Sequence, residues 1–115
     1  GPWSFYGEVG QLLYRSYYEE GKREGRCYAY YADGSLYSLL NYHQGKLQGQ
    51  QLYYYSDGTL KTEENYEKGL LEGAVQLYYV NGRLKKEQFF SEGRLHGHER
   101  MWDEWGKLIV EWAIK

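Results

Sequence analysis

The sequence repeats itself at a fixed step of 24 residues, and this constrains the fold more than any other feature. Three columns of glycine and three columns of leucine or other apolar residues keep the step without insertion or deletion. The columns are Gly21, Gly45, Gly69 and Gly93; Gly25, Gly49, Gly73 and Gly97; Gly10, Gly34, Gly58, Gly82 and Gly106; Leu12, Leu36, Leu60, Leu84 and Leu108; Tyr6, Tyr30, Tyr54, Tyr78 and Trp102; and Tyr18, Tyr42, Tyr66, Phe90 and Ile114. Such a chain is expected to stack like units, each contacting its neighbours.

The step defines one repeat domain over residues 5–115. It holds a half unit at 5–20 and four units at 21–44, 45–68, 69–92 and 93–115. Residues 1–4 are expected to be a scar and an N-terminal cap, because Gly1-Pro2 is typical of the remnant left when a protease removes an expression tag. A chain of 115 residues is long enough for one domain with a modest core.

Each unit contains two strand-like runs with a hairpin signal between them. In the unit 45–68 the runs are 51–56 and 60–66, and Asp57-Gly58 separates them. Asp-Gly favours the positive φ angles of a two-residue hairpin turn, and Tyr and Thr favour a pleated, half-buried surface. The Glu and Lys content of 60–73 would also permit a helix, but its glycine pair would end it at once and no apolar stripe has helical spacing. We therefore predict two antiparallel strands in each unit.

A second signal, Gly-x-Leu-x-Gly, connects one hairpin to the next. Its leucines, Leu47, Leu71 and Leu95, are too apolar for a solvated loop, so we expect them to fold back as plugs. Arg23 takes the leucine position in the first full unit. An end of the array has less core to fill, which is consistent with this exchange.

Side chains alternate across a strand, so the run from residue 60 to 66 divides into two sets. One face is predicted to carry Leu60, Thr62, Glu64 and Tyr66, and the other Lys61, Glu63 and Asn65. The predicted core is then a thin layer of stacked leucines and rings, repeated once per unit.

The predicted fold class is all-β, an elongated antiparallel β-meander built as a solenoid-like array of β-hairpin repeats. With strands ~4.8 Å apart, each unit advances roughly 10 Å and the chain should reach about 40–45 Å. Apolar residues gather at both ends, where such an array needs caps. They are Trp3, Phe5 and Tyr6 at the start and Trp102, Trp105, Ile109, Val110, Trp112 and Ile114 at the end. The C-terminal group is alternatively a homodimer contact, because an open edge strand invites pairing.

The units resemble the variant form of the MORN repeat, on Gly-x-Leu-x-Gly followed by Tyr-Tyr-x-Asp-Gly-x-Leu, and the resemblance covers residues 5–115. The last unit departs from the pattern, with Trp102-Asp103 in place of Tyr-Tyr and Trp105 before the turn glycine. The best-named members are YwqK-like antitoxins, immunity proteins of bacterial toxin-antitoxin systems. The resemblance implies a β-hairpin array with a binding role, and it supplies no catalytic residue.

Composition argues against several classes of protein. A net charge of −2 gives no electrostatic footprint for nucleic acid. Cys27 is the only cysteine, so neither an intrachain disulfide nor a paired-thiolate metal site is expected, and it should be a small, partly buried residue. No run of 18 apolar residues predicts a membrane span. The N-terminus lacks a signal-peptide pattern, which favours the cytoplasm, although a leader upstream of residue 1 would not be seen.

Candidate catalytic and metal-binding groups are sparse. His96 and His98 could share one side of a strand, but no third ligand is near them in the sequence, and a Cys27–His43 dyad lacks an orienting group. Adjacent carboxylates such as Glu63 and Glu64 point to opposite faces of a strand. We therefore predict no catalytic residue, no metal site and no cofactor, and the protein is not expected to be an enzyme.

Tyrosine, with 15 copies, is the candidate binding group. Tyr31, Tyr55 and Tyr79 should point away from the core column, as should Tyr53, and repetition spaces their rings roughly 10 Å apart. Tyrosine offers a large contact area with few rotors and a polar tip. The predicted partner-binding residues are Tyr31, Tyr53, Tyr55, Tyr79, Glu63 and Glu87, with Lys61 and Lys85 as a further rim. Alternatively, the rings only stabilise the ladder through cross-strand pairs.

The favoured function is a non-catalytic protein-binding module, an antitoxin or immunity protein that neutralises a cognate bacterial toxin through this tyrosine- and carboxylate-lined face. Mild acidity suits a basic toxin. One alternative is a structural scaffold or assembly subunit, dimeric through the C-terminal aromatic cluster. A peripheral membrane-binding module is disfavoured, because the lysines are interleaved with glutamates.

Overall fold

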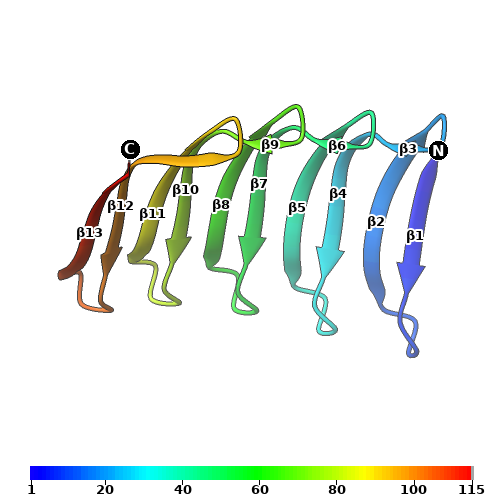
Figure 1. Cartoon of the computed structure of the whole chain (residues 1–115). Coiled ribbons are helices and arrows are strands. Elements are labelled where there is room, and N and C mark those ends of the chain that lie inside the picture. The colour runs from blue at the N-terminus through cyan, green and yellow to red at the C-terminus, as the bar shows by residue number, and fades with distance from the viewer. Residues whose placement is uncertain (115) are drawn as a thin grey trace.

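The strands lie side by side along the whole molecule, from β1 at one edge to β13 at the other, in this computed structural model of residues 1–114 (Figure 1). Their bounds are Pro2–Tyr6 (β1), Leu12–Glu19 (β2), Lys22–Arg23 (β3), Gly25–Tyr30 (β4), Leu36–His43 (β5), Lys46–Leu47 (β6), Gly49–Tyr54 (β7), Leu60–Glu67 (β8), Leu70–Leu71 (β9), Gly73–Tyr78 (β10), Leu84–Ser91 (β11), Arg94–Trp102 (β12) and Leu108–Ile114 (β13). The described residues contain no helix, and so none that is long and apolar enough to cross a membrane.

All pairing is antiparallel and joins strands in the order β1-β2-β4-β5-β7-β8-β10-β11-β12-β13, with β3, β6 and β9 paired to the strand before them. The prediction of an all-β, elongated antiparallel meander is therefore confirmed. The molecule measures 44 × 31 × 15 Å, and its long dimension agrees with the length expected from strand spacing. Strand β1 begins at Pro2 and pairs Pro2 with Tyr17, so the stretch that was set apart as scar and cap takes part in the sheet.

The Asp-Gly hairpins have three-residue loops. In the unit 45–68, Tyr55 N–H donates to the Thr59 carbonyl (2.8 Å), and Gly58 N–H donates back to the Tyr55 carbonyl (3.0 Å). Gly58 has a φ of 93°, whereas the φ of Asp57 is not positive. The prediction of a two-residue turn here is wrong. The loop has three residues, 56–58, and only the last of them, Gly58, is left-handed. Asp57 accepts from both the backbone N–H and the hydroxyl of Thr59.

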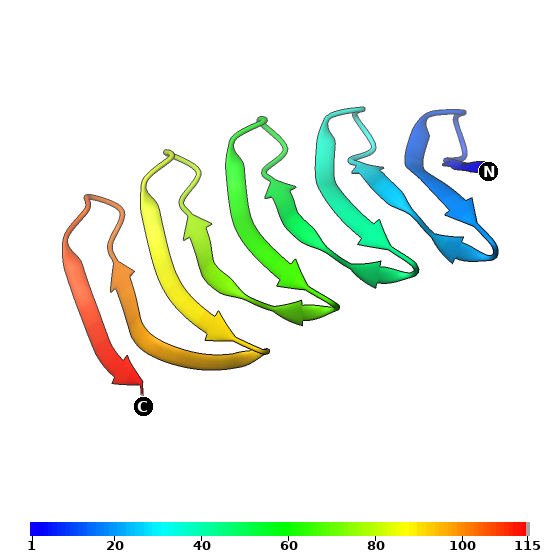
Figure 2. The same ribbon diagram turned by 90° about the horizontal axis from the view of Figure 1, so that it is seen from above.

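The two-residue turns occur instead at the Gly-x-Leu-x-Gly end of each unit. Between the paired residues Glu67 and Leu70, Lys68 (φ 51°) and Gly69 (φ 84°) are both left-handed, the combination that a tight hairpin requires. Gly69 N–H donates to the Leu47 carbonyl of the preceding unit (3.0 Å). The tight turns therefore lie in a row at one end of the strands, and the three-residue loops lie in a row at the opposite end (Figure 2). We call these ends the turn end and the loop end of the sheet.

The sheet has two faces of different character. Tyr53 pairs with Thr62, and the neighbouring Leu52 pairs with Glu63, so these two pairs point to opposite sides. We call the Tyr53 side the inner face, because it carries the buried residues of the described chain, and the Glu63 side the outer face. The buried residues are Ser16, Cys27, Ser38, Gln51 and Val75.

The predicted core of leucines and rings needs correction. Leucines 12, 36, 60 and 84 and the Tyr18 to Ile114 column are only half-buried, and Leu108 is exposed. A sheet of one layer has no second layer to cover large side chains, so burial falls on small or polar residues near the middle of the strands. Gln51 is 0% exposed, and its amide bonds the backbone of Asn41 in both directions (2.7 and 3.1 Å), which satisfies its polar atoms.

A register shift also changes which residues share a face. Across the hairpin, Tyr53 pairs with Thr62 but Tyr54 pairs with Leu60, so Lys61 is an extra residue in the longer strand. Leu60 therefore lies with Tyr54 on the outer face, and the prediction that it shares a face with Thr62 and Tyr66 is wrong. The predicted plugs do fold back, since Leu47 and its equivalents pair with the ring column and are half-buried.

Most of the residues predicted to form end caps remain exposed. Trp3, Phe5 and Tyr6 are exposed at one edge, as are Trp105, Ile109 and Trp112 at the other, whereas Trp102, Val110 and Ile114 are half-buried. The open edges follow from the single layer, because the end of such a sheet exposes a strand and not the end of a core.

Candidate functional site

The tyrosine row expected from the sequence is built into the contacts between repeats. The hydroxyl of Tyr31 donates to the Tyr54 carbonyl (2.7 Å), that of Tyr55 to the Tyr78 carbonyl (2.6 Å), and that of Tyr79 to the Trp102 carbonyl (2.7 Å). Each bond joins one unit to the next, and each ring is half-buried. These bonds favour the alternative in which the row stabilises the ladder, although part of each ring is exposed.

Tyr53 belongs to a cluster of three rings that the sequence did not single out as a group. The ring of Tyr37 lies 5.2 Å from that of Tyr31 and 6.1 Å from that of Tyr53, edge to face in both cases. We call Tyr31, Tyr37 and Tyr53 the tyrosine cluster. It spans two units on the inner face, and Tyr37 is exposed. Tyr37 was missed because the register shift turns its column, predicted outward with Lys61, to the inner face.

Lysines lie over Tyr55 and Tyr79, the equivalents of Tyr31 in the next two units. Lys61 Nζ is 5.6 Å from the centre of the Tyr55 ring, and Lys85 Nζ is 5.5 Å from that of Tyr79. In these cation–π contacts the lysines are exposed and the rings are half-buried. The inner face thus carries tyrosines and positive charge at its loop end.

The two glutamates predicted to rim the tyrosines lie on the other face of the sheet. Glu63 accepts from Gln50 Nε2 (2.7 Å), and Glu87 accepts from Gln76 Nε2 (3.1 Å). Arg100 lies 3.7 Å from Glu87 and 2.6 Å from Glu111. We call these six residues the outer ladder. The structure therefore brings Tyr31 and Tyr53 together but separates both from Glu63 and Glu87.

The inner face has a carboxylate of its own, Glu64. It lines a cavity of about 170 Å³ together with Tyr37, Tyr53, Lys61 and Thr62. Burial raises the pKa of Glu64. Burial, and after it the charge of Glu64, raises the pKa of Tyr53 to about 12. Alternation placed Glu64 on the predicted core face, but the prediction that Tyr53 points away from that face is wrong, because Tyr53 pairs with Thr62 and lines the same cavity as Glu64.

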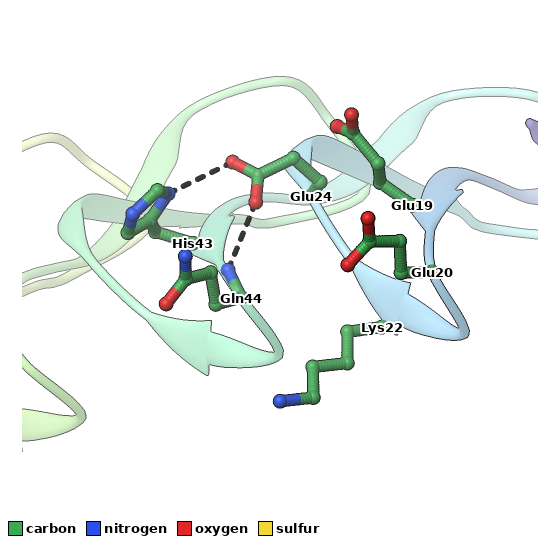
Figure 3. A pocket seen from close by; sticks show the side chains of 6 residues that line it. All are labelled: Glu19, Glu20, Lys22, Glu24, His43 and Gln44. Carbon is green, nitrogen blue, oxygen red and sulfur yellow. Dashed lines mark hydrogen bonds and ion pairs between the residues drawn. The ribbon is translucent and has the colours of Figure 1, made fainter.

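A second hollow lies at the turn end of the sheet and is lined by Glu19, Glu20, Lys22, Glu24, His43 and Gln44 (Figure 3). Glu24 accepts from the Gln44 N–H (2.9 Å), and its other oxygen lies 3.0 Å from His43 Nδ1. These two bonds, the backbone one first, lower the pKa of Glu24. The same contact recurs one and two units later, where Gln48 and Glu72 accept from the next left-handed residue. Glu24 is thus part of the turn architecture.

The remaining histidines do not form a site either. His96 and His98 are exposed, as predicted for solvated side chains. Within residues 1–114 no three His, Cys, Asp or Glu side chains are grouped so that they could hold a metal ion.

The architecture defines the class of protein, a single-layer array of β-hairpin repeats whose faces offer surfaces for binding. The family model of the MORN repeat variant matches residues 23–44 and 47–68, which are two of the four full units. MORN repeats are generally protein- or membrane-binding modules and are non-catalytic. No curated protein matches the chain.

Proposed function

We propose that the chain is a protein-binding module that acts as an antitoxin or immunity protein and neutralises a cognate toxin by covering part of it. The finer part of this proposal, the toxin, rests on the resemblance of the units to YwqK-like antitoxins. The general part, protein binding, rests on the repeat class of residues 23–68.

The observation that carries the proposal is the tyrosine cluster beside Glu64 and Lys61 on the inner face. Rigid rings with polar tips, a carboxylate and an ammonium group converge on one cavity. Tyrosine is one of the residues enriched at the energetic centre of protein interfaces, where its ring offers a large contact area with a polar tip. The outer ladder is less suited to this role, because its carboxylates already accept hydrogen bonds from neighbours in the sheet.

Co-expression tests the proposal. The reading frames beside the gene of the chain are screened for one whose product stops growth, the chain is produced together with that product, and growth is measured. We expect the chain to restore growth and to co-elute with the toxin. The double change Tyr37→Ser and Tyr53→Ser should abolish both effects, while Glu63→Gln with Glu87→Gln on the outer face should retain them. Circular dichroism confirms that both variants are folded.

Growth that is not restored, with no co-elution, would refute the antitoxin role. Loss of rescue only in the outer-face variant would show that the partner binds the other face.

The exposed apolar residues at the sheet edges favour a second candidate, an assembly subunit that pairs edge to edge. Ile109 and Trp112 on β13 are exposed beside an unpaired strand edge. Light scattering after size exclusion tests it. A dimer mass that Trp112→Lys returns to the monomer would support assembly through this edge, and a monomer at every concentration would exclude it.

A further inference from the structure

Glu64 has no partner for its charge among the described residues. Gln51 lies opposite it in the β7–β8 pair, but the Gln51 amide is used by the backbone of Asn41 and Gly49. The ion pairs of residues 1–114 involve Glu24, Glu87 and Glu111, and none involves Glu64. A half-buried carboxylate without a counter-charge is costly, which is why burial raises its pKa. A cation brought by another molecule would remove this cost.

Aromatic rings lie beside the same carboxylate. Tyr37 and Tyr53 line its cavity, and Tyr66 is near enough for the Glu64 charge to raise the pKa of its phenol, after burial. Ring faces attract cations, and this attraction grows where water is partly excluded. Rings beside a carboxylate thus form a receptor for a flat cation.

The inner face already holds one guanidinium against tyrosine rings. Arg23, at the leucine position of the first full unit, lies over three rings, 5.4 Å from Tyr42, 5.7 Å from Tyr14 and 5.9 Å from Tyr18. Tyr42 has Tyr66 as its equivalent one unit further along. Two of the three rings that hold Arg23 therefore have equivalents one unit later, Tyr42 and Tyr66, and there Leu47 takes the place of the arginine.

From this geometry we infer that the cavity between Tyr37, Tyr53 and Glu64 binds an arginine side chain of the partner protein. The guanidinium stacks on the rings and donates two hydrogen bonds to the carboxylate, which the ammonium of lysine cannot do in the same plane. The inference deepens the proposed protein-binding function and depends on it only for the source of the arginine.

Lys61 is the one cationic group that lines the cavity. Its ammonium lies over the Tyr55 ring, at the loop end of the sheet, and forms no ion pair with Glu64. It would still repel an incoming guanidinium at short range. Removing it should therefore strengthen binding, which gives a variant that moves in the opposite direction to loss of Glu64.

The test uses the chain alone and a small probe. N-acetyl-arginine amide is titrated into isotope-labelled protein, and the shifts of the Tyr37 and Tyr53 rings and of the Glu64 carboxyl carbon are followed by NMR. N-acetyl-citrulline amide, the uncharged analogue of the same shape, is the matched control, and N-acetyl-lysine amide tests the preference for guanidinium. The variants are Glu64→Gln, Lys61→Met and, as a matched loss of charge on the outer face, Glu63→Gln.

We expect arginine amide to shift these three side chains and citrulline amide to leave them unchanged. Glu64→Gln should weaken arginine binding about fivefold or more, Glu63→Gln should leave it unchanged, and Lys61→Met should strengthen it. Equal shifts from arginine and citrulline, or binding that survives in folded Glu64→Gln, would overturn the site. Equal affinity for lysine would overturn the assignment to arginine. Because no partner protein is present, this result is independent of the growth test.

Discussion

The inner and outer faces of the same strands solve different problems. On the inner face, burial concentrates in the middle of the strands, at Cys27, Gln51 and Val75. On the outer face, charged and amide side chains of neighbouring strands bond one another, from Gln50 to Glu111. Burial contributes most of the stability of a fold, whereas exposed ion pairs contribute little. The fold should therefore depend on the inner face, and the outer face should tolerate change.

The largest effect should come from a charge placed on the buried side. Val75→Asp would bury a carboxylate without a partner at a position that is 5% exposed, and we expect it to lower the free energy of unfolding by about 3 kcal/mol or more. Asn65→Asp, exposed on the outer face, should change it by less than about 0.5 kcal/mol. Urea unfolding measures both. Equal effects would remove the distinction between the faces.

The tyrosine hydroxyls that join the units should come next. Changing Tyr31, Tyr55 and Tyr79 together to Phe keeps the rings but removes three bonds to carbonyls, at about 1 kcal/mol each. Glu87→Gln in the outer ladder should cost less than about 1 kcal/mol. Thermal unfolding compares them. A triple variant that melts with the unchanged protein would show that these tyrosines do not hold the repeats together.

A smaller gain is expected at Ser16. Its hydroxyl is buried on the inner face and finds no hydrogen-bond partner within residues 1–114. Ser16→Ala removes an unsatisfied polar group and should stabilise the chain by up to about 1 kcal/mol. Ser4→Ala, at an exposed position of the outer face, should be neutral. Destabilisation by Ser16→Ala would indicate that the hydroxyl is bonded in solution.

The smallest effects, and the ones with opposite signs, concern pH. Burial raises the pKa of Glu64 above the ordinary value of 4.5, so the ionised carboxylate destabilises the fold at neutral pH, and this cost disappears as the pH falls through the raised pKa. Arg100 lowers the pKa of Glu111, so that carboxylate stabilises the fold above pH 4.5, and the gain is lost as the pH falls through the lowered pKa.

Glu64→Gln should therefore raise stability at pH 7, and Glu111→Gln should lower it. Both differences should vanish in acid, where the native side chains are protonated as well. Unfolding curves recorded from neutral to acid pH measure the two variants side by side. The same sign for both would mean that Glu64 is not in a desolvated site.

The sequence by itself determined the unit, its two strands, their antiparallel order and the length of the array. These follow from period and turn chemistry, which are local, and from strand spacing, which is the same in all sheets. It also placed Thr62, Glu64 and Tyr66 on one face, because no irregularity interrupts the strand between them.

Only the tertiary structure decided on which face of the sheet the side chains of residues 60 and 61 lie, and which side chains contact one another. One extra residue in a strand reverses alternation beyond it, and no pattern in the sequence marks Lys61 as that residue. The partners of the tyrosine hydroxyls are carbonyls 23 residues away, which become neighbours only when units stack. Because the register of the strands sets the faces, the predicted binding residues lie on two different faces, the tyrosines on one and Glu63 and Glu87 on the other. The residues beside Tyr53 are instead Glu64 and Tyr37.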